Sequence, residues 1–143
     1  MKGDVSERDS VVRERLRKAR IFYETAKLVL GHKDYDSAMS RFYHSANQAI
    51  KAVLLNAGLR SAAQSTDHIR PIDEFVKLGK ASSWAKMIAV PKRHRDLRSC
   101  LKWLYERRLD ADYEPGNRIV RTDALEARTF VGNFIASVER IVK

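Results

Sequence analysis

The sequence predicts an all-α protein, an antiparallel up-and-down bundle of four long helices with one or two short helices between them. Glycine and proline are scarce, at six and three of 143 residues, which disfavours turn-rich β architecture. Four long segments carry apolar residues at alternating steps of three and four, as amphipathic helices do. Mostly short connections favour antiparallel packing. Residues 1–143 therefore fit a single domain, with residues 1–8 expected to be disordered.

The first two predicted helices form a hairpin. The first runs from about Asp9 to Leu30 and stops at Gly31, because glycine favours helix ends. The second begins near Asp36, a good N-cap residue, and stops at Gly58. The apolar stripes are Val12, Leu16, Ala19, Tyr23, Ala26 and Leu30 in the first helix and Ala38, Phe42, Ala46, Ala49, Val53 and Ala57 in the second.

A less regular stretch follows the hairpin. Residues 59–66 are predicted to form a loop. A short helix fits Pro71 to Leu78, because proline is well tolerated in a first helical turn. Residues 80–90 are ambiguous and fit a second short helix that ends before Pro91.

Two more long helices complete the predicted bundle. Pro91 can open the third, whose apolar stripe leads to Arg108. Residues 110–120 contain the turn-forming Pro115-Gly116-Asn117 and are predicted to be a loop. The last helix takes Thr122 as N-cap and runs to about Val142. The stripe of the third helix is Leu97, Leu101, Leu104 and Arg108, and that of the last helix is Ala124, Ala127, Val131, Phe134, Val138 and Ile141.

The net charge of +10 is concentrated in one segment. Residues 77–108 hold ten basic residues against only Asp96 and Glu106. Such a segment attracts polyanions, of which nucleic acid is the commonest intracellular candidate. The alternative interpretation is a solvated helix face.

No membrane or secretory segment is recognisable in the sequence. The first residues carry charges of both signs without an apolar core, so no signal peptide is predicted. Apolar runs end after about four residues, far short of the ~20 needed to cross a bilayer. We therefore expect a cytoplasmic protein that does not bind a membrane.

Metal, cofactor and common nucleotide-enzyme sites are not predicted. Cys100 stands alone and fits core packing. No two histidines are four residues apart, and one cysteine cannot build a zinc site. Glycine-rich phosphate loops and dinucleotide fingerprints do not occur. His44 is interpreted as a core or interfacial residue that could alternatively face a cleft, and His68 as part of a helix start. The histidines are His32, His44, His68 and His94.

The most unusual feature is the end of the third long helix, where Arg108 occupies the last position of an apolar stripe. Burial of an unpaired guanidinium is costly. Arg108 should therefore pair with Asp110 or Asp112, or face a cleft as part of a functional site. In the structural alternative, the ion pair closes the helix C-terminus and the Tyr113 ring packs over the end of the bundle.

Several segments, in their order and spacing, resemble the HEPN superfamily. More narrowly, the chain resembles a small prokaryotic branch with an Arg-x-Tyr-Tyr second helix and an Arg-x-x-Ala-Asp-Tyr motif after the fourth. The similarity covers about residues 10–142. The segments that carry it are Arg41-Phe42-Tyr43-His44-Ser45-Ala46-Asn47-Gln48-Ala49-Ile50-Lys51-Ala52-Val53-Leu54-Leu55, Gly58, His68 seven residues before Phe75, and Arg108-Leu109-Asp110-Ala111-Asp112-Tyr113.

The resemblance implies a homodimer, often encoded beside a small nucleotidyltransferase as a toxin and antitoxin pair. Active members of the superfamily are metal-independent ribonucleases that use Arg-x(4-6)-His, with the motifs of two protomers meeting in a cleft. By position, Arg108 corresponds to the arginine that stabilises charge on the scissile phosphate, a role that suits a bidentate guanidinium. Asp112 and Tyr113 complete the candidate catalytic motif. The residues expected to bind nucleic-acid phosphates are Arg93, Arg95, Arg98, Lys102 and Arg107.

One departure from the family pattern lowers the catalytic expectation. Tyr113 stands where an active nuclease has its histidine. A histidine can take and give a proton at neutral pH, whereas a free tyrosine, with a pKa near 10, is almost entirely protonated. Ribonuclease activity is therefore expected to be weak or absent. Partner enzymes elsewhere in the family adenylylate a tyrosine near the motif, which makes Tyr113 a candidate modification site despite its different spacing.

Three hypotheses about function follow. The first is an HEPN-type protein that binds RNA or nucleotide in a basic cleft around Arg108, within a toxin and antitoxin or defence pair. The second is a non-catalytic interaction module that binds a nucleotidyltransferase and no nucleic acid. The third, a DNA-binding helical protein, is disfavoured because no helix-turn-helix with a short glycine-containing turn can be placed.

Overall fold

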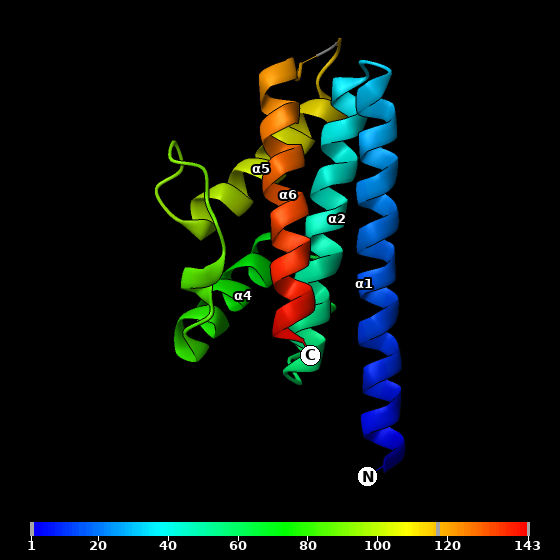
Figure 1. Cartoon of the computed structure of the whole chain (residues 1–143), viewed down its shortest axis with the longest axis vertical. Helices are drawn as coiled ribbons and strands as arrows, with labels where there is room; N and C mark the ends of the chain where they lie inside the picture. The colour runs from blue at the N-terminus through cyan, green and yellow to red at the C-terminus, as the bar shows by residue number, and fades with distance from the viewer. Residues whose placement is uncertain (1, 117, 143) are drawn as a thin grey trace.

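The described part of the chain is entirely helical outside its loops (Figure 1). The structure is a computed structural model that describes residues 2–116 and 118–142, without the side chains of residues 2–6. No strand occurs in these residues, which confirms the predicted all-α class. The elements are α1 (Lys2–Gly31), α2 (Tyr35–Asn56), α3 (Arg60–Ala63), α4 (Ile69–Ser82), the 3-10 helix η1 (Ala85–Met87), α5 (Leu97–Tyr113) and α6 (Arg121–Ile141).

Helix α2 is the centre of the bundle. It packs against α1, α4, α5 and α6, and it buries large side chains such as Phe42, Met39 and Leu54. Figure 1 shows α1, α2 and α6 side by side, with α5 crossing them obliquely and α4 on the same side as α5. The start of α1 extends beyond the other helices. The buried interior contains Phe75 and Phe134, whose rings meet edge to face at 5.4 Å between centroids.

The start of α2 differs from the prediction in an informative way. Asp34, not Asp36, is the N-cap, because its carboxylate accepts a hydrogen bond from the backbone N–H of Ser37 at 3.1 Å. The Asp36 carboxylate instead accepts the backbone N–H groups of Arg118 at 3.1 Å and Ile119 at 2.8 Å. Asp36 therefore holds the segment before α6 against the first turn of α2.

Both predicted ends of α5 are wrong. The helix begins at Leu97, six residues after Pro91, because Asp96 caps it by accepting a hydrogen bond from Ser99 N at 2.9 Å. It continues to Tyr113, so the first part of the predicted 110–120 loop is helical. Carboxylates three and four residues after the two arginines pair with them along the last turns, which stabilises the helix there. Consequently the whole stretch from Arg108 to Tyr113 lies on a helix.

The other boundaries also shift. Helix α1 begins at Lys2 rather than Asp9. The disorder expected for residues 1–8 stays a prediction, since Met1 and the side chains of residues 2–6 lie outside the described part. The predicted 59–66 loop contains the four-residue α3, and α4 is longer than Pro71 to Leu78 on both sides. Helix α6 starts at Arg121, with Val120 rather than Thr122 at the N-cap.

The ambiguous 80–90 stretch contains the 3-10 helix η1, directly after a tight turn. The turn has Ser83 in the left-handed region, at φ 66°. Gly79 lets the Trp84 ring fold back onto α4, because a Cβ at this position would lie only 2.9 Å from the Trp84 side chain. Tertiary packing of an aromatic ring therefore shapes this segment.

Most of the predicted apolar stripes are buried. Cys100 is fully buried, as expected for a core residue, and burial raises the pKa of its thiol to about 12. The exception in the second helix is Ala57, which is exposed because α2 ends at Asn56. None of the helices in the described part of the chain combines the length and the apolar character that a membrane span requires.

Candidate functional site

Arg108 lies on the face of α5 that packs towards α2. It follows the buried Leu97, Leu101 and Leu104 on the same stripe, and only 14% of its side chain is exposed. Its Nε lies 2.7 Å from Asp112 Oδ2. Asp110 points to the other flank of α5, where Arg107 Nη2 lies 2.6 Å from its Oδ2. Of the two carboxylates considered from the sequence, Asp112 is the partner of Arg108.

The hydrogen-bonding capacity of Arg108 is only partly used. Its Nε–H is buried and makes no hydrogen bond within the described residues, because the Asp112 carboxylate lies close by but off the N–H direction. The guanidinium carbon lies 5.6 Å from the centre of the Tyr43 ring and 5.7 Å from that of Tyr113. Electron-rich ring faces stabilise a guanidinium electrostatically without competing for its N–H donors. Arg108 is thus held by one carboxylate and two ring faces.

Four side chains from three parts of the chain gather beside Arg108, and we call them the Tyr-His cluster: Tyr43, His44, His68 and Tyr105. The hydroxyl of Tyr43 lies 2.6 Å from His68 Nδ1. The rings of His68 and Tyr105 are nearly parallel, at 20° and 5.3 Å between centroids. The Tyr43 ring contacts those of His44 at 5.3 Å and Tyr105 at 5.7 Å. The cluster joins α2, the residue before α4, and α5.

Burial and the charge of Arg108 hold the two histidines in their neutral form, and burial holds Tyr43 in its neutral form. The pKa of His44 is lowered, first by burial and then by the positive charge of Arg108, while Asp112 opposes the shift. The pKa of His68 is lowered by the same two causes. Burial raises the pKa of the Tyr43 hydroxyl well above its ordinary value. At neutral pH the two imidazoles therefore carry no charge and the phenol keeps its proton.

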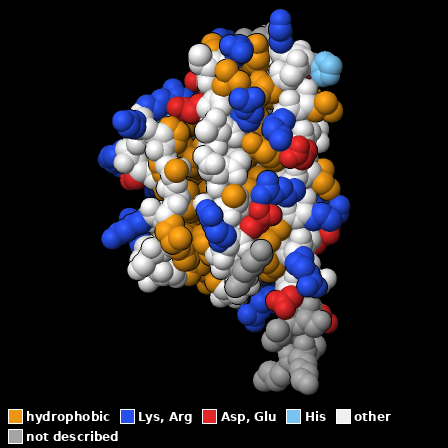
Figure 2. All heavy atoms as spheres, viewed as in Figure 1, with side chains coloured by type: hydrophobic (Ala, Val, Ile, Leu, Met, Phe, Trp, Pro, Cys, Tyr) orange, Lys and Arg blue, Asp and Glu red, His pale blue; other side chains and the backbone are white. Residues whose placement is uncertain are grey.

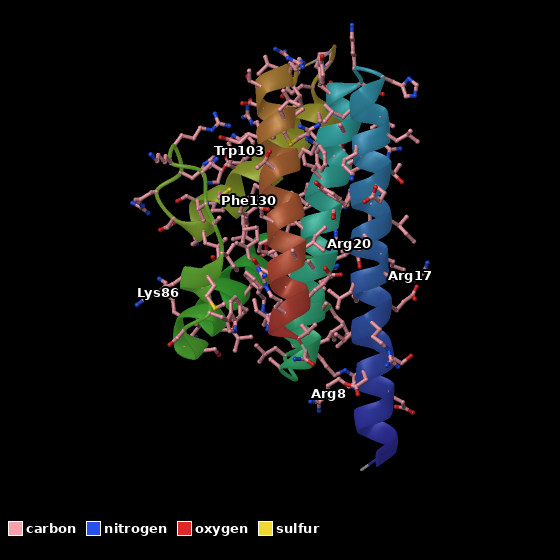
Figure 3. All side chains as sticks on the ribbon, in the orientation of Figure 1. Arg8, Arg17, Arg20, Lys86, Trp103 and Phe130 are labelled. Atoms are coloured by element: carbon pink, nitrogen blue, oxygen red, sulfur yellow. The ribbon has the colours of Figure 1, made fainter. Side chains whose placement is uncertain are left out.

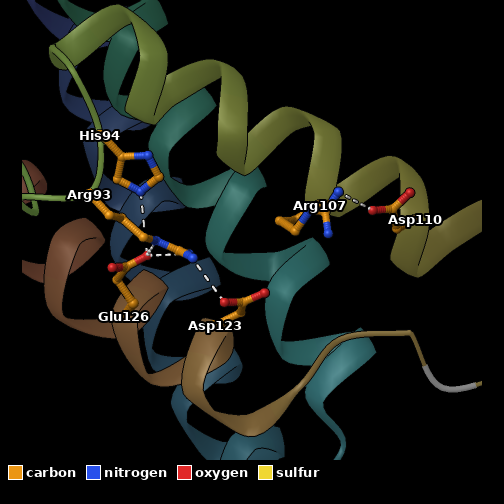
Figure 4. A network of polar contacts seen from close by, with 6 residues as sticks. All are labelled: Arg93, His94, Arg107, Asp110, Asp123 and Glu126. Atoms are coloured by element: carbon orange, nitrogen blue, oxygen red, sulfur yellow. Dashed lines mark hydrogen bonds and ion pairs between the residues drawn. The ribbon is translucent and has the colours of Figure 1, made fainter.

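Several of the basic residues predicted to guide phosphates pair with carboxylates of the chain. The Arg93 guanidinium lies 4.5 Å from the centre of the Trp103 ring and is bound by two carboxylates of α6. Its Nε donates to Glu126 Oε2 at 2.8 Å and its Nη2 to Asp123 Oδ1 at 3.1 Å. Figure 4 shows this network and, further along α5, the pair of Arg107 with Asp110. These arginines are neutralised within the chain.

The remaining predicted phosphate contacts lie elsewhere on α5 or before it. Arg98 Nε donates to Asp73 Oδ1 of α4 at 2.6 Å. Arg95 is the most exposed of the group, with 87% of its side chain accessible and Asp96 at 3.7 Å. Lys102 is half-buried, one helical turn after Arg98. On the face drawn in Figure 2, Lys and Arg side chains are interspersed with carboxylates and apolar groups, not gathered in one patch.

A shallow hollow of about 430 Å³ lies beside Asp112, between the start of α2 and the end of α5. It is open to solvent and mixes carboxylates with one arginine, so it is not the basic cleft that the sequence predicted. Its lining is Asp34, Asp36, Ser37, Ser40, Arg41, Ala111 and Asp112. No group of three or more His, Cys, Asp or Glu side chains able to hold a metal ion occurs within the residues that the structure describes.

Sequence reasoning identified Arg108 but missed most of its surroundings. Tyr105 lies three residues before Arg108, and this spacing alone places it on the same flank of α5. Tyr43 and His44 were visible in the second-helix motif. His68 was part of the family resemblance, but its contact with Tyr43 was not visible in the sequence, because only the packing of α4 against α2 and α5 brings the two together.

Tyr113 lies at the last residue of α5, and 71% of it is exposed. The structural alternative had the Tyr113 ring packed over the end of the bundle. The ring instead contacts the Arg108 guanidinium and is mostly exposed. An exposed phenol beside an arginine is accessible to a modifying enzyme.

The fold and the site define a single helical bundle with a largely buried arginine beside two neutral histidines. The family model for the HEPN domain matches residues 12–141, nearly the whole chain. The protein therefore belongs to the HEPN domain family. No curated protein sequence matches the chain at a significant level.

Proposed function

We propose that this HEPN protein binds RNA or nucleotide at Arg108 and acts as a homodimer, paired with a nucleotidyltransferase in a toxin and antitoxin or defence system. The observation that supports the binding is the state of Arg108 itself. Its guanidinium is largely buried, pairs with a single carboxylate, and otherwise lies against the faces of Tyr43 and Tyr113, which leave its charge incompletely balanced. A phosphate with several acceptor oxygens fits such a cation.

Our proposal includes that the protein cleaves RNA weakly or not at all. Its Arg-x-x-Ala-Asp-Tyr motif is the feature that would place it in the small prokaryotic branch of the superfamily. The motif position of the histidine is occupied by Tyr113, and a phenol is a poor proton acceptor at neutral pH. Asp112 is engaged with Arg108, so it screens the cation in the free protein. The tyrosine argues against catalysis, and a phosphate has to compete with Asp112 for Arg108.

The deciding experiment measures binding of a labelled single-stranded RNA over a series of salt concentrations. Arg108→Ala should weaken binding about tenfold and reduce the slope of log K against log salt by about one, because one phosphate contact is lost. Arg17→Ala is the matched control, since it removes the same charge from an exposed side chain that pairs only with Glu14 on its own helix (Figure 3). Undetectable or salt-insensitive binding of the wild type, or equal effects of the two variants, contradicts the proposal.

Tyr113 is the proposed acceptor of a modification by the partner enzyme. Its exposure gives access to the hydroxyl, and the nearby Arg108 can bind the phosphate groups of an incoming nucleotide. The experiment incubates the chain with ATP and the nucleotidyltransferase encoded beside it, and reads the mass of the intact protein. Tyr113→Phe should abolish the mass increase, and persistence of the increase with this variant excludes Tyr113.

A second candidate function is an interaction module that binds the nucleotidyltransferase and no nucleic acid. The in-chain neutralisation of the basic segment favours it, because Arg93, Arg98 and Arg107 each already pair with a carboxylate. The RNA experiment separates the candidates. Co-purification of the partner with a chain that fails to bind RNA supports the module, and RNA binding that Arg108→Ala abolishes supports the first proposal.

A further inference from the structure

His68 is a polar side chain to which the proposed function gives no role. It occupies the N-cap position of α4, yet its side chain makes no capping hydrogen bond. Its Nδ1 faces α2 instead, 2.6 Å from the Tyr43 hydroxyl. The side chain is thus directed by a tertiary contact and not by the helix that it precedes.

The contact with Tyr43 determines which nitrogen of His68 carries the proton. Tyr43 is 3% exposed, and within the described residues His68 Nδ1 is the one hydrogen-bond partner of its hydroxyl. A buried hydroxyl proton needs an acceptor, so the phenol donates and Nδ1 accepts. A neutral imidazole that accepts at Nδ1 carries its proton at Nε2. His68 therefore presents an N–H donor at its other edge.

The donor edge of His68 is held in a fixed position near Arg108. The Tyr105 ring lies nearly parallel to the imidazole at 5.3 Å, and the Tyr43 ring lies at 5.8 Å from it. Arg108 contacts the same Tyr43 ring at 5.6 Å, and its charge lowers the pKa of His68. His68 Nε2 makes no hydrogen bond with any described residue. The cationic Arg108 and the neutral His68 thus flank one aromatic ring.

We propose that the Nε2–H of His68 donates a hydrogen bond to the phosphate bound by Arg108, and that Tyr43 is the positioning residue that fixes the required tautomer. The inference rests on the proposed function, since it assigns a second ligand to the phosphate of the same RNA or nucleotide. A charged fork and a neutral N–H together satisfy more phosphate oxygens than either group does alone. The chemical class recognised is a phosphate monoester or diester.

The first test reads the histidine side chains of the intact wild-type protein by ¹⁵N NMR. We expect His68 to show an unprotonated Nδ1 and a protonated Nε2 at neutral pH. Addition of inorganic phosphate, and in a separate arm of a nucleoside monophosphate, should shift the His68 signals and raise the pKa of His68. The exposed His32 is the internal control and should respond far less. A proton on Nδ1, or equal responses of His68 and His32, overturns the inference.

The second test compares variants in phosphate and nucleotide binding. Tyr43→Phe keeps the ring but removes the hydroxyl, and His68→Phe keeps an aromatic ring but removes the donor. Each should weaken binding about tenfold, the effect of losing one hydrogen bond to a charged group. His68→Gln offers an amide N–H near the same place and should recover part of the loss, and His32→Gln should change nothing. Equal affinity of Tyr43→Phe and wild type overturns the positioning role.

The outcomes also separate this inference from the proposed function. RNA binding that needs Arg108 but tolerates His68→Phe and Tyr43→Phe leaves the proposed function intact and removes the inference. A His68 response to free phosphate without any RNA binding removes the RNA proposal and keeps the anion site. Should Tyr43→Phe fail to fold, the wild-type tautomer and the phosphate titration decide the matter.

Discussion

At the scale of single residues, the charge of Arg108 affects the protonation of the histidines beside it. Arg108 is paired with Asp112 and lowers the pKa of two histidines that burial already disfavours as cations. Because both imidazoles are neutral, they do not repel Arg108, and their nitrogens remain free to accept or donate. The Asp112 carboxylate is then the group that competes with an incoming phosphate.

Asp112→Asn should therefore change stability and affinity in opposite directions. Loss of the carboxylate leaves a largely buried guanidinium without a counter-charge, which should lower the free energy of unfolding by about 1–3 kcal/mol. The same change removes the competitor of a phosphate, so affinity for inorganic phosphate should rise. Urea unfolding measures the first effect and calorimetric titration the second.

Asp110→Asn is the matched control for Asp112→Asn. It breaks the Arg107 pair on the other flank of α5, where a third of each side chain is exposed, so its cost should stay below about 1 kcal/mol. Phosphate affinity should not change. A fall in phosphate affinity with Asp112→Asn would show that the carboxylate orients Arg108 for the ligand and does not compete with it.

At the scale of elements, the site depends on how α5 is bounded and how the segment before α6 is held. Asp96 caps α5, and the Asp36 carboxylate on α2 binds the backbone of Arg118 and Ile119. Asp36→Ala should lower the free energy of unfolding by about 1–2 kcal/mol, because two backbone N–H groups lose their acceptor. Asp34→Ala removes only the N-cap hydrogen bond of α2, and the free energies of unfolding of the two variants are compared in urea. An effect of Asp36→Ala below about 0.5 kcal/mol would mean that water replaces the acceptor.

The apolar periodicity predicted the existence of all four long helices, and the C-terminal ends of α1 and α6 were predicted to within a residue, but neither end of α5 was predicted. Proline is common at helix starts, so Pro91 was expected to open α5. The helix instead begins after Asp96, which caps it, and Arg93 between them forms ion pairs with α6. Residues 110–113 were expected to be a loop because Pro115 and Gly116 follow closely, but the spacing of three and four from the arginines favours helix. Local signals compete at such ends, and tertiary contacts decide the outcome.

At the scale of the whole molecule, the Tyr-His cluster exists only because α2, α4 and α5 meet. Arg108 could be singled out from the sequence, since a cation on an apolar stripe is visible as a break in pattern. The contact of His68 with Tyr43 could not, because the two residues lie 25 positions apart and His68 belongs to a segment with no strong periodicity. Ion pairs between elements, such as that of Arg98 with Asp73, cannot be foreseen from the sequence either.

The cluster makes the stability of the whole fold depend on pH. Both histidines have a folded-state pKa below the unfolded value of about 6.5, so the unfolded chain binds more protons as the pH falls below that value. The free energy of unfolding should therefore be constant above about pH 7 and decrease as the pH falls below about 6.5. The charged groups that act on the two imidazoles are Arg108, Lys51, Asp67 and Asp112, and His68 also acts on His44. Replacement of both histidines by glutamine should flatten this decrease, as measured by urea unfolding at each pH.

His32→Gln, at an exposed site, should leave the pH profile of the free energy of unfolding unchanged. A double variant that keeps the full decrease would show that other groups produce it and that the cluster does not stay neutral by burial.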